Sequence, residues 1–496
     1  MSNPKKIRNW TYTDLGRVVA EQDVNLVDYY VSPSKYVERA SDVNDSAVFY
    51  VGPKGIGKSA ILQMVRLTLP QESNRIINIT PDNLAFSALA NIEVTTPILN
   101  MIGKQKWFFK SIWDYLLTVE ILRREYKNQT WLRQSVGKLY RSPFEKKAQK
   151  LLDTCLKDDG KPVNLMNTII DLLDSVELSA ETDSAKIAAN IKADKKSEGN
   201  KNLELFSIIN SVAKDTCDNI KHNYYIVIDD LDQNWRNDPV QNEFLSGLFQ
   251  SLKNFSKPPR IKCLVSMRED IYKNIIIQDR DKFHDWVCNV KWDFSEIKEM
   301  VTLRVHKKTG LNRNMIWGGL FPENGFDFLF KHTQERPREL IRLTHLCLEG
   351  AKQSGRNQIE KEDMIKALKL FSEEKIEDLA SEKHFLYPYL NLALKRFRGW
   401  PKEFSYKQFK SEYAEMINLE IVCKEGNAIK YSWAGGYDKD AKGLAVILLE
   451  VGFLLFKSDE KSRTAQYDID NPQNLTENTW LAIHPVYCSG LNLKGD

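Results

Sequence analysis

Paired cysteines are lacking in this sequence of 496 residues. Its seven cysteines are scattered singly, without a C-x-x-C pair and without histidines at metal-ligand spacing, so we expect neither a disulfide framework nor a zinc site. No apolar segment reaches the roughly 18 residues that a membrane-spanning helix needs, and the first residues contain no apolar signal core. These absences predict a cytoplasmic protein without membrane contact.

A large excess of one charge is also lacking, because 71 basic residues face 67 acidic ones and the formal net charge is +4. Nucleic acid could therefore be bound only through a local basic patch. With 42% hydrophobic and 28% charged residues, the composition is that of an ordinary globular protein. The chain is too long for one core, and its length predicts about two or three domains.

What the sequence does contain is a phosphate-binding loop within residues 46–62, SAVFYVGPKGIGKSAIL. The apolar run 47–51 predicts a buried strand, and a helical pattern follows the loop. Glycines let backbone N–H groups turn toward phosphates, and the helix directs the positive end of its dipole at them. We expect Lys58 to reach the β- and γ-phosphates of ATP as a catalytic residue, and Ser59 to ligate Mg²⁺. The predicted nucleotide-binding residues here are Gly52, Pro53, Lys54, Gly55, Ile56, Gly57, Lys58, Ser59 and Ala60.

A second apolar strand, in the stretch YYIVIDDLD at 224–232, ends in acidic residues. We expect Asp229, at the end of the strand, to ligate Mg²⁺ together with Ser59. Asp230 is then predicted to orient or deprotonate an attacking water as a catalytic residue. Many related ATPases have a glutamate there, and the shorter aspartate predicts slow hydrolysis.

A third apolar strand, RIKCLVSMREDIY at 260–272, ends in polar side chains that face the ligand side of a doubly wound sheet. Ser266 or Arg268 could therefore sense the γ-phosphate. The alternative is that Arg268 pairs with Glu269 or Asp270 at the surface. The residues alone leave both interpretations open.

A proline near the start of a predicted helix marks a further candidate, because Pro337 suits the first helical turn. Arg336 and Arg338 flank it, and in nucleotide switches an arginine or proline at such a helix start reaches back to the nucleotide. We therefore predict that Arg336 and Pro337 bind nucleotide, with a solvated basic helix face as the alternative. Arg304 and Arg268 are candidates for an arginine finger on position alone.

Helical periodicity dominates from about residue 104, most clearly in the stretch WFFKSIWDYLLTVEILRREY. A strand is expected at 75–79 and a strand pair at 176–187. We interpret 104–200 as a helical insertion into a P-loop core that spans 1–295. Further helical patterns predict a lid domain over 296–384.

The last part of the chain, 385–496, is predicted to fold as a winged helix. We expect a strand in KYSWAG, a helix running into a strand in GLAVILLEVGFLLFKS, and a hairpin that closes near His484. Trp400 and Tyr406 lie among basic residues that could contact phosphates while the rings stack on bases. Winged helices also dock proteins or act as lids, so DNA and protein both stay open as partners. His484 is predicted to be a core histidine. The basic cluster consists of Lys395, Arg396, Arg398, Lys402, Lys407 and Lys410.

The motifs GPKGIGKS, IVIDDLD, CLVSMREDIY, ERPRELIRL and AIHPVY together resemble those of one group of prokaryotic P-loop ATPases. They are similar to the signal-transducing ATPases called STAND and to the KAP ATPases, and the order of core, lid and winged helix also resembles archaeal origin-recognition proteins. The resemblance implies an AAA-related α/β fold, ATP and Mg²⁺ as cofactors, and a Gly-x-Pro motif at the nucleotide. The matching triplet here, Glu335-Arg336-Pro337, lacks the glycine. Such proteins often lie in antiviral defence loci beside a nuclease or another effector.

Three functions remain open from the sequence. The first is an ATP-dependent switch that assembles with itself or controls an effector in antiphage defence, its lid and winged helix rearranging upon hydrolysis. The second is an origin-recognition-type ATPase that grips duplex DNA, for which DNA-stimulated turnover would be the sign. The third is a scaffold that holds nucleotide without hydrolysing it.

Overall fold

The computed structural model describes residues 10, 14–70, 74–79, 107–126, 142–155, 208–231, 239–256, 259–277, 280–384, 386–413, 441–457, 460–461 and 475–494. The chain divides into two compact units. The sheet unit is Ser32–Lys291, and the helical unit joins Met1–Val31 to Trp292–Asp496. The sheet unit thus lies within the span predicted for the P-loop core, whereas the N-terminal segment belongs to the helical unit. A further boundary at residue 384 stays a prediction.

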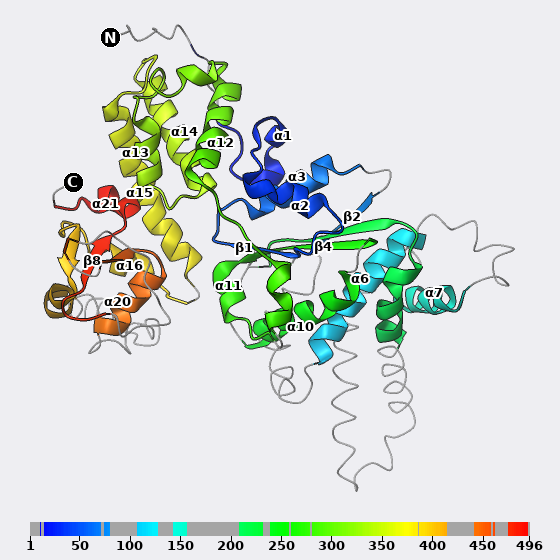
Figure 1. The fold of residues 1–496 in the computed structure, drawn as a ribbon. Helices are drawn as coiled ribbons and strands as arrows, with labels where there is room; N and C mark the ends of the chain where they lie inside the picture. The colour runs from blue at the N-terminus through cyan, green and yellow to red at the C-terminus, as the bar shows by residue number, and fades with distance from the viewer. Residues whose placement is uncertain are drawn as a thin grey trace. The chain divides into compact units, whose positions relative to one another are not determined.

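A five-stranded sheet, with every pair of neighbouring strands parallel, forms the centre of the sheet unit (Figure 1). Strand β4 separates the P-loop strand β1 from the acidic strand β3, because the strand order is β2-β3-β4-β1-β5. Most residues of these three strands are buried, as expected where helices cover both faces of a parallel sheet. The four strands predicted along this part of the sequence are confirmed. The strands are β1 (Phe49–Gly52), β2 (Asn74–Ile79), β3 (Asn223–Ile228), β4 (Ile261–Arg268) and β5 (Val287–Asn289).

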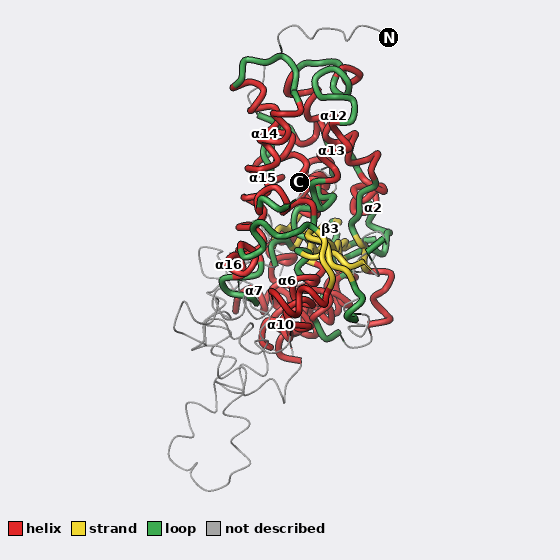
Figure 2. Tube along the Cα trace, turned by 90° about the vertical axis from the view of Figure 1, so that its left-hand side faces the viewer, coloured by secondary structure: helices red, strands yellow, loops and turns green. Residues whose placement is uncertain are grey.

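Helices cover the two faces of this sheet, as the red and yellow tubes of Figure 2 also show. Helices α2 (Tyr36–Ser41) and α3 (Lys58–Thr68) lie on one face, and α6 (Trp107–Tyr126) and α10 (Pro239–Phe255) lie on the other. Helix α6 coincides with the strongest predicted helical stretch. Its residue Trp113 is fully buried in the core of the sheet unit and donates from Nε1 to the carbonyl of Phe244 at 2.8 Å.

Helix α7 (Pro143–Cys155) and a helix over 208–219 pack against the opposite side of α6 in a smaller hydrophobic cluster. The interpretation of 104–200 as an insertion stays a prediction, because much of that span lies outside the described residues. The strand pair expected at 176–187 lies outside them too.

Four helices form the first part of the helical unit. Helix α12 begins with a capping box, in which the Asp293 carboxylate accepts the N–H of Glu296, and it ends at Gly310 with φ +72°. Pro337 occupies the first turn of α14, as predicted. The helices are α12 (Phe294–Thr309), α13 (Gly325–Lys331), α14 (Pro337–Gln353) and α15 (Lys361–Glu382), and the N-terminal segment adds η1 (Ala20–Gln22) and α1 (Leu26–Tyr29).

The remaining described residues of the helical unit form short helices and a small antiparallel sheet with the strand order β6-β8-β7. The predicted helix that runs into a strand is confirmed as α20 and β7. The KYSWAG strand lies outside the described residues. The elements are α16 (Leu390–Lys395), β6 (Glu403–Ser405), α17 (Tyr406–Gln408), the π-helix η8 (Phe409–Tyr413), α20 (Ala441–Glu450), β7 (Leu454–Lys457), β8 (Trp480–Ile483) and α21 (Pro485–Leu491).

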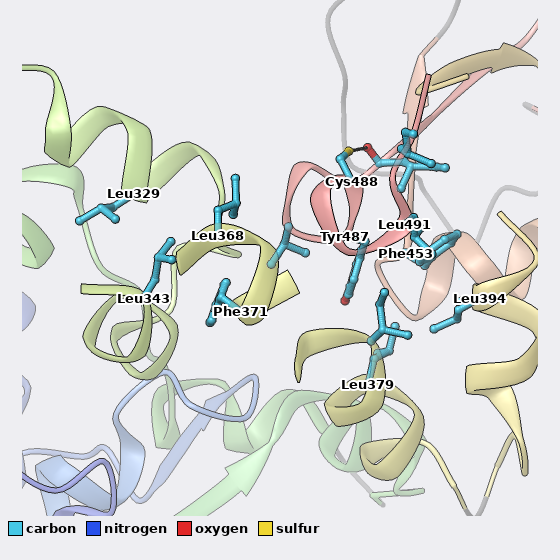
Figure 3. Close-up of a cluster of buried hydrophobic side chains, with 14 of the residues drawn as sticks. Leu329, Leu343, Leu368, Phe371, Leu379, Leu394, Phe453, Tyr487, Cys488 and Leu491 are labelled. Carbon is cyan, nitrogen blue, oxygen red and sulfur yellow. Dashed lines mark hydrogen bonds between the residues drawn. The ribbon is translucent and has the colours of Figure 1, made fainter. Parts of the chain in front are cut away.

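One hydrophobic core connects both parts of the helical unit (Figure 3). Phe371 of α15 lies in the same cluster as Phe453 and Tyr487, which follow it by more than eighty residues in the sequence. Helices α15 and α21 approach closely, since the Ser372 hydroxyl accepts the N–H of Gly490 at 2.8 Å. The segments predicted as lid and winged helix therefore share a core.

Candidate functional site

The phosphate loop connects β1 to α3 between Gly52 and Lys58. Gly55 and Gly57 have φ values of +82° and +103°, in the left-handed region that glycine adopts without strain. At Gly52, an added Cβ would lie 3.0 Å from Ile56 Cγ2 and 3.3 Å from the Val290 carbonyl oxygen. The loop therefore requires its glycines for backbone reasons, and this backbone is what lets N–H groups converge on a phosphate.

Lys58, the first residue of α3, has a buried side chain that turns back over the loop. Its ammonium donates to the carbonyls of Gly52 and Pro53, both at 2.9 Å. This arrangement holds a positive charge beside the backbone cradle and at the positive end of the helix dipole. An anion is the ligand that fits such a donor set.

The acidic strand delivers its first carboxylate to the same place. Asp229 directly follows β3, is 3% exposed, and has its Oδ1 atom 3.4 Å from the Ser59 hydroxyl, which can donate to it. A hydroxyl and a carboxylate are hard oxygen ligands of the kind that Mg²⁺ takes in P-loop sites. Residues separated by 170 positions in the sequence are thus adjacent, as the two motifs predicted.

Asp230 faces differently from its neighbour. It is exposed, its φ is +58°, and its backbone N–H donates to Asp229 Oδ1 at 2.9 Å. Aspartate tolerates the left-handed conformation better than most residues, because its short side chain can bond locally. The turn at Asp230 thus gives the two carboxylates different surroundings, one enclosed beside Ser59 and one in contact with water.

The end of β4 brings two further predicted residues to this edge of the sheet. The parallel register places Ser266 beside Tyr50 and Arg268 beside Gly52. Arg268 donates from Nε to Asp270 Oδ1 at 3.0 Å, so it has the partner that the alternative named, but its side chain is 11% exposed and does not lie at the surface. Nucleotide sensing by Ser266 or Arg268 stays a prediction.

The helical unit contains the predicted pair Arg336 and Pro337. Arg336 is the N-cap residue of α14, and its Nη1 atom lies 3.9 Å from Glu339 Oε1. Glu335 has φ +57°, so the chain adopts a glycine-like conformation at the position where the Gly-x-Pro pattern has its glycine. Arg338 is exposed. Contact between this helix start and a nucleotide stays a prediction.

Sequence reasoning did not single out Glu339, a buried carboxylate that fixes this turn. Its Oε2 atom accepts the N–H of Gln334 at 2.6 Å, and its Oε1 atom forms an ion pair with Lys375 at 3.0 Å. An acidic residue in the first turn of a helix that reaches back to a preceding N–H is a capping pattern. That pattern was the available signal in the sequence.

Arg304, a candidate arginine finger on position alone, is buried. It is 6% exposed, and its Nη1 atom donates to the Leu15 carbonyl at 3.0 Å and lies 3.2 Å from Asp23 Oδ2. A finger must extend into a neighbouring subunit, whereas this guanidinium is enclosed within its own unit. The suggestion of Arg304 as a finger is therefore wrong.

The aromatic residues of the predicted DNA patch are also buried. Trp400 and Tyr406 are each 6% exposed and pack with neighbouring rings, among them Phe397, whose centroid lies 4.1 Å from that of Trp400. They cannot stack on bases, so this part of the prediction is wrong. In the basic cluster, Lys395 pairs with Glu377 and Lys410 lies 3.6 Å from Glu477, while Arg398 and Lys407 are exposed.

His484 caps the last helix, α21. Its Nδ1 atom accepts the N–H of Val486 at 3.2 Å, and partial burial lowers the pKa of His484 to about 4. The imidazole is therefore neutral at physiological pH and bonded as a structural acceptor. The partly buried, bonded imidazole has a structural role, as predicted, although it lies at the edge of the core and not within it.

Within the described ranges, no three His, Cys, Asp or Glu side chains group as a separate metal site. Five cysteines in those ranges are buried and free of disulfides. Among the helices that the structure describes, none is long and apolar enough to cross a bilayer.

Comparison with known proteins identifies the first helices of the helical unit as a recurring module. Residues 295–380 match the family model described as the FunZ-associated C-terminal helical domain, which takes in most of α12 to α15. The chain is also similar to a protein of Escherichia coli (strain K12) named transposon gamma-delta 80.3 kDa protein. The two sequences are 22% identical, and the match covers 97% of this chain and 67% of that protein.

Three solved structures are similar to this chain at low sequence identity. The Aeropyrum pernix ORC1 protein in complex with DNA is 10% identical, with 95% of each chain covered and a TM-score of 0.40. Cdc6p from Pyrobaculum aerophilum is 12% identical. The match covers 92% of this chain and 91% of that one, with a TM-score of 0.33. The Thermotoga maritima RuvB Holliday junction branch migration motor is 11% identical. The match covers 65% of this chain and 96% of that one, with a TM-score of 0.24.

The strand order and the loop geometry of the chain itself define its fold class. A parallel sheet carries the phosphate loop after β1 and the acidic residues after β3, with helices on both faces. The chain therefore has an α/β fold of the P-loop ATPase type, as predicted from the two motifs.

Proposed function

We propose that this protein binds ATP with Mg²⁺ at the P-loop, hydrolyses it slowly, and uses the nucleotide as a switch. The observation that carries the proposal is the approach of the Ser59 hydroxyl to the Asp229 carboxylate at 3.4 Å beside a loop that requires glycine. Two distant motifs that meet in this way are difficult to explain without a phosphate-bound metal.

Each residue of the site then has a distinct task. Lys58 and the loop N–H groups bind the phosphates, and Ser59 and Asp229 hold Mg²⁺, which supplies neutralisation of phosphate charge. Asp230, exposed at the same edge, orients a water and accepts its proton. Arg268 lies beside Gly52, and we propose that it contacts the γ-phosphate while its guanidinium remains paired with Asp270.

Substituting the loop lysine tests nucleotide binding most directly. Lys58→Ala is expected to weaken ATP binding about a hundredfold in calorimetry, since it removes charge-assisted hydrogen bonds to the phosphates. The matched control is Lys273→Ala, which removes an exposed lysine of the same unit that pairs with Glu269. Unchanged ATP affinity in a folded Lys58→Ala protein would refute the proposal.

The two aspartates allow a separate test of their roles. Asp229→Asn is expected to abolish the dependence of ATP affinity on Mg²⁺, because it removes a charged ligand. Asp230→Asn is expected to keep Mg²⁺-dependent binding and to lower turnover by about a hundredfold or more. If both variants show the same defect, the assignment of separate roles is wrong; undiminished turnover in Asp230→Asn would favour a scaffold that does not hydrolyse ATP.

The switch acts on a partner in this proposal, through Arg336 and Pro337 contacting the nucleotide from the helical unit. The partner is a second copy of the chain or a separate effector such as a nuclease, in an antiphage defence role, because the sequence contains no catalytic motif beyond the ATPase. Size-exclusion chromatography with and without ATP tests nucleotide-driven assembly. Arg336→Ala should abolish the ATP-dependent shift, and a shift that survives in this variant would exclude Arg336 from the switch.

DNA binding by the C-terminal region is the second candidate. Its elements follow the order expected of a winged helix, with α16, β6, α17, α20 and then the β7–β8 pair, and Arg398 and Lys407 are exposed. The helix that such a domain would insert into the major groove is α20, whose described residues are mostly buried and include Leu444 and Leu448. We therefore propose contact with phosphates only, without sequence readout.

A further inference from the structure

A buried arginine ties the N-terminal segment to the helical unit. Residues 14–31, here called the strap, surround the guanidinium of Arg304 in α12. The strap supplies the Leu15 carbonyl at 3.0 Å, the Asp23 carboxylate at 3.2 Å, and the ring of Tyr29, whose centroid lies 4.3 Å from Arg304 Cζ. Tyr29 in turn donates its hydroxyl hydrogen to Asp23.

The enclosure of this charge makes the strap a structural part of the helical unit. The side chains of Arg304 and Asp23 are 7% and 2% exposed, so neither has much water to replace a lost partner. Removing one member of a buried ion pair leaves an uncompensated charge and is strongly destabilising. Gly16, with φ +89°, fits the same enclosure, because a Cβ there would lie 2.4 Å from the Tyr29 hydroxyl.

The C-terminal region is also bonded to the helices of the helical unit. Ser372 and Gly490 bond α15 to α21, and Gln334 Nε2 lies 3.4 Å from the Tyr487 hydroxyl, which can accept its hydrogen. Phe371 and Tyr487, from the two segments, lie in one hydrophobic core. Strap, helices α12–α15 and C-terminal region are thus built as one body.

The chain therefore passes between the two units twice. It leaves the helical unit after Val31 and returns to it at Trp292. On the sheet-unit side, one side chain joins these two crossings, because the Tyr36 hydroxyl donates to the Asn289 carbonyl at 3.0 Å and accepts the N–H of Lys291 at 3.1 Å.

From these contacts we infer that the helical unit is a lever that moves as one body, strap included, and that the chain joins it to the sheet unit at the crossings Val31–Ser32 and Lys291–Trp292. This inference rests on the proposed function, because the nucleotide switch supplies the signal that moves the lever. It replaces the rearrangement of lid against winged helix that the sequence suggested. Tyr36 is the residue that keeps the two crossings together.

Amide hydrogen exchange on the full chain tests the unity of the lever without nucleotide. Arg304→Met is expected to raise exchange in the strap and in α12 together, by at least tenfold, and to leave α3 unchanged. Arg313→Met is the control, because it removes an exposed arginine that pairs with Glu299 in the same unit. Tyr29→Phe is the milder variant should Arg304→Met not fold. A strap that exchanges rapidly in wild type, or is released while α12 stays protected, overturns the inference.

A cross-link tests whether the strap must leave α12 during turnover. Asp14 and Lys308 lie 3.5 Å apart at their charged atoms, so Asp14→Cys with Lys308→Cys can be bridged by a short bis-maleimide. Turnover of the bridged protein is expected to stay within twofold of the same variant capped with N-ethylmaleimide. A larger loss overturns the inference. If the wild type hydrolyses no ATP, the proposed hydrolysis fails, and the exchange experiment still decides the fate of the strap.

Discussion

One arginine of the sheet unit and one of the helical unit differ in how far away in the sequence their polar partners lie. In the sheet unit, Arg268 bonds Asp270, two residues away, at the end of the strand that carries both. In the helical unit, Arg304 donates to the carbonyl of Leu15, 289 residues away, and its guanidinium is enclosed by the strap. By position in the sequence both arginines are candidates for an arginine finger. The partner of Arg268 could be found from its neighbours in the sequence, whereas the partners of Arg304 could not.

The largest expected effect is a loss of stability of the helical unit when His484 is protonated. It sharpens the comparison because the change is confined to one of the two units. The folded-state pKa of His484, about 4, lies below the 6.5 of an ordinary histidine, so the unfolded chain binds a proton first as the pH falls. Stability is therefore unaffected above about pH 6.5 and declines as the pH falls toward 4, by about 3 kcal/mol. His484→Asn, which keeps an N-cap acceptor, should remove this part of the acid loss.

Urea unfolding of wild type and His484→Asn at pH 7 and pH 4 measures this difference. A signal from the helical unit is needed, since a chain of two units need not unfold in one step. Equal losses in both proteins between the two pH values would show that the imidazole is solvated and would contradict its assignment as an enclosed cap.

The second largest effect is expected at glycines where two helices touch, and Gly247 and Gly490 provide one test in each unit. A Cβ at Gly247 would lie 2.7 Å from the backbone carbon of Phe109 in α6, and one at Gly490 would lie 2.8 Å from Ser372 Oγ in α15. Alanine at either position should lower the free energy of unfolding by about 1–3 kcal/mol, because the helices must separate. Gly350→Ala is the control, since nothing lies within 4 Å of its Cβ, and it should raise stability by about 0.5–1 kcal/mol.

Denaturant unfolding with unit-specific probes checks these variants. The comparison between the units predicts that Gly247→Ala unfolds the sheet unit earlier and Gly490→Ala the helical unit. Destabilisation of both units by either change would mean that the two cores are energetically one.

The smallest expected effect concerns the basic cluster. Arg398→Ala with Lys407→Ala should reduce the slope of log affinity against log salt for duplex DNA by about one unit per lost phosphate contact. Lys395→Ala should change it less, because that ammonium is engaged by Glu377. Retention on a DNA column at several salt concentrations measures the slopes. An absence of salt-dependent retention would assign the exposed cations to a protein partner.

Short-range patterns in the sequence by themselves determined the phosphate loop, the acidic strand, and helices such as α6 and α15. Glycine spacing, apolar periodicity and a proline at a helix start act within a few residues, so they specify φ angles and buried faces directly. The meeting of Ser59 with Asp229 was also predictable, because parallel strands end at one edge of a sheet.

Only the tertiary structure decided the burial of Arg304, Trp400 and Tyr406, and the joining of the strap to the helical unit. These outcomes depend on partners up to hundreds of residues away, as with Arg304 and Leu15. A charge or ring that could face solvent or ligand is buried when distant segments supply its hydrogen bonds and packing, since those contacts offset the cost of desolvation. No local pattern contains that information.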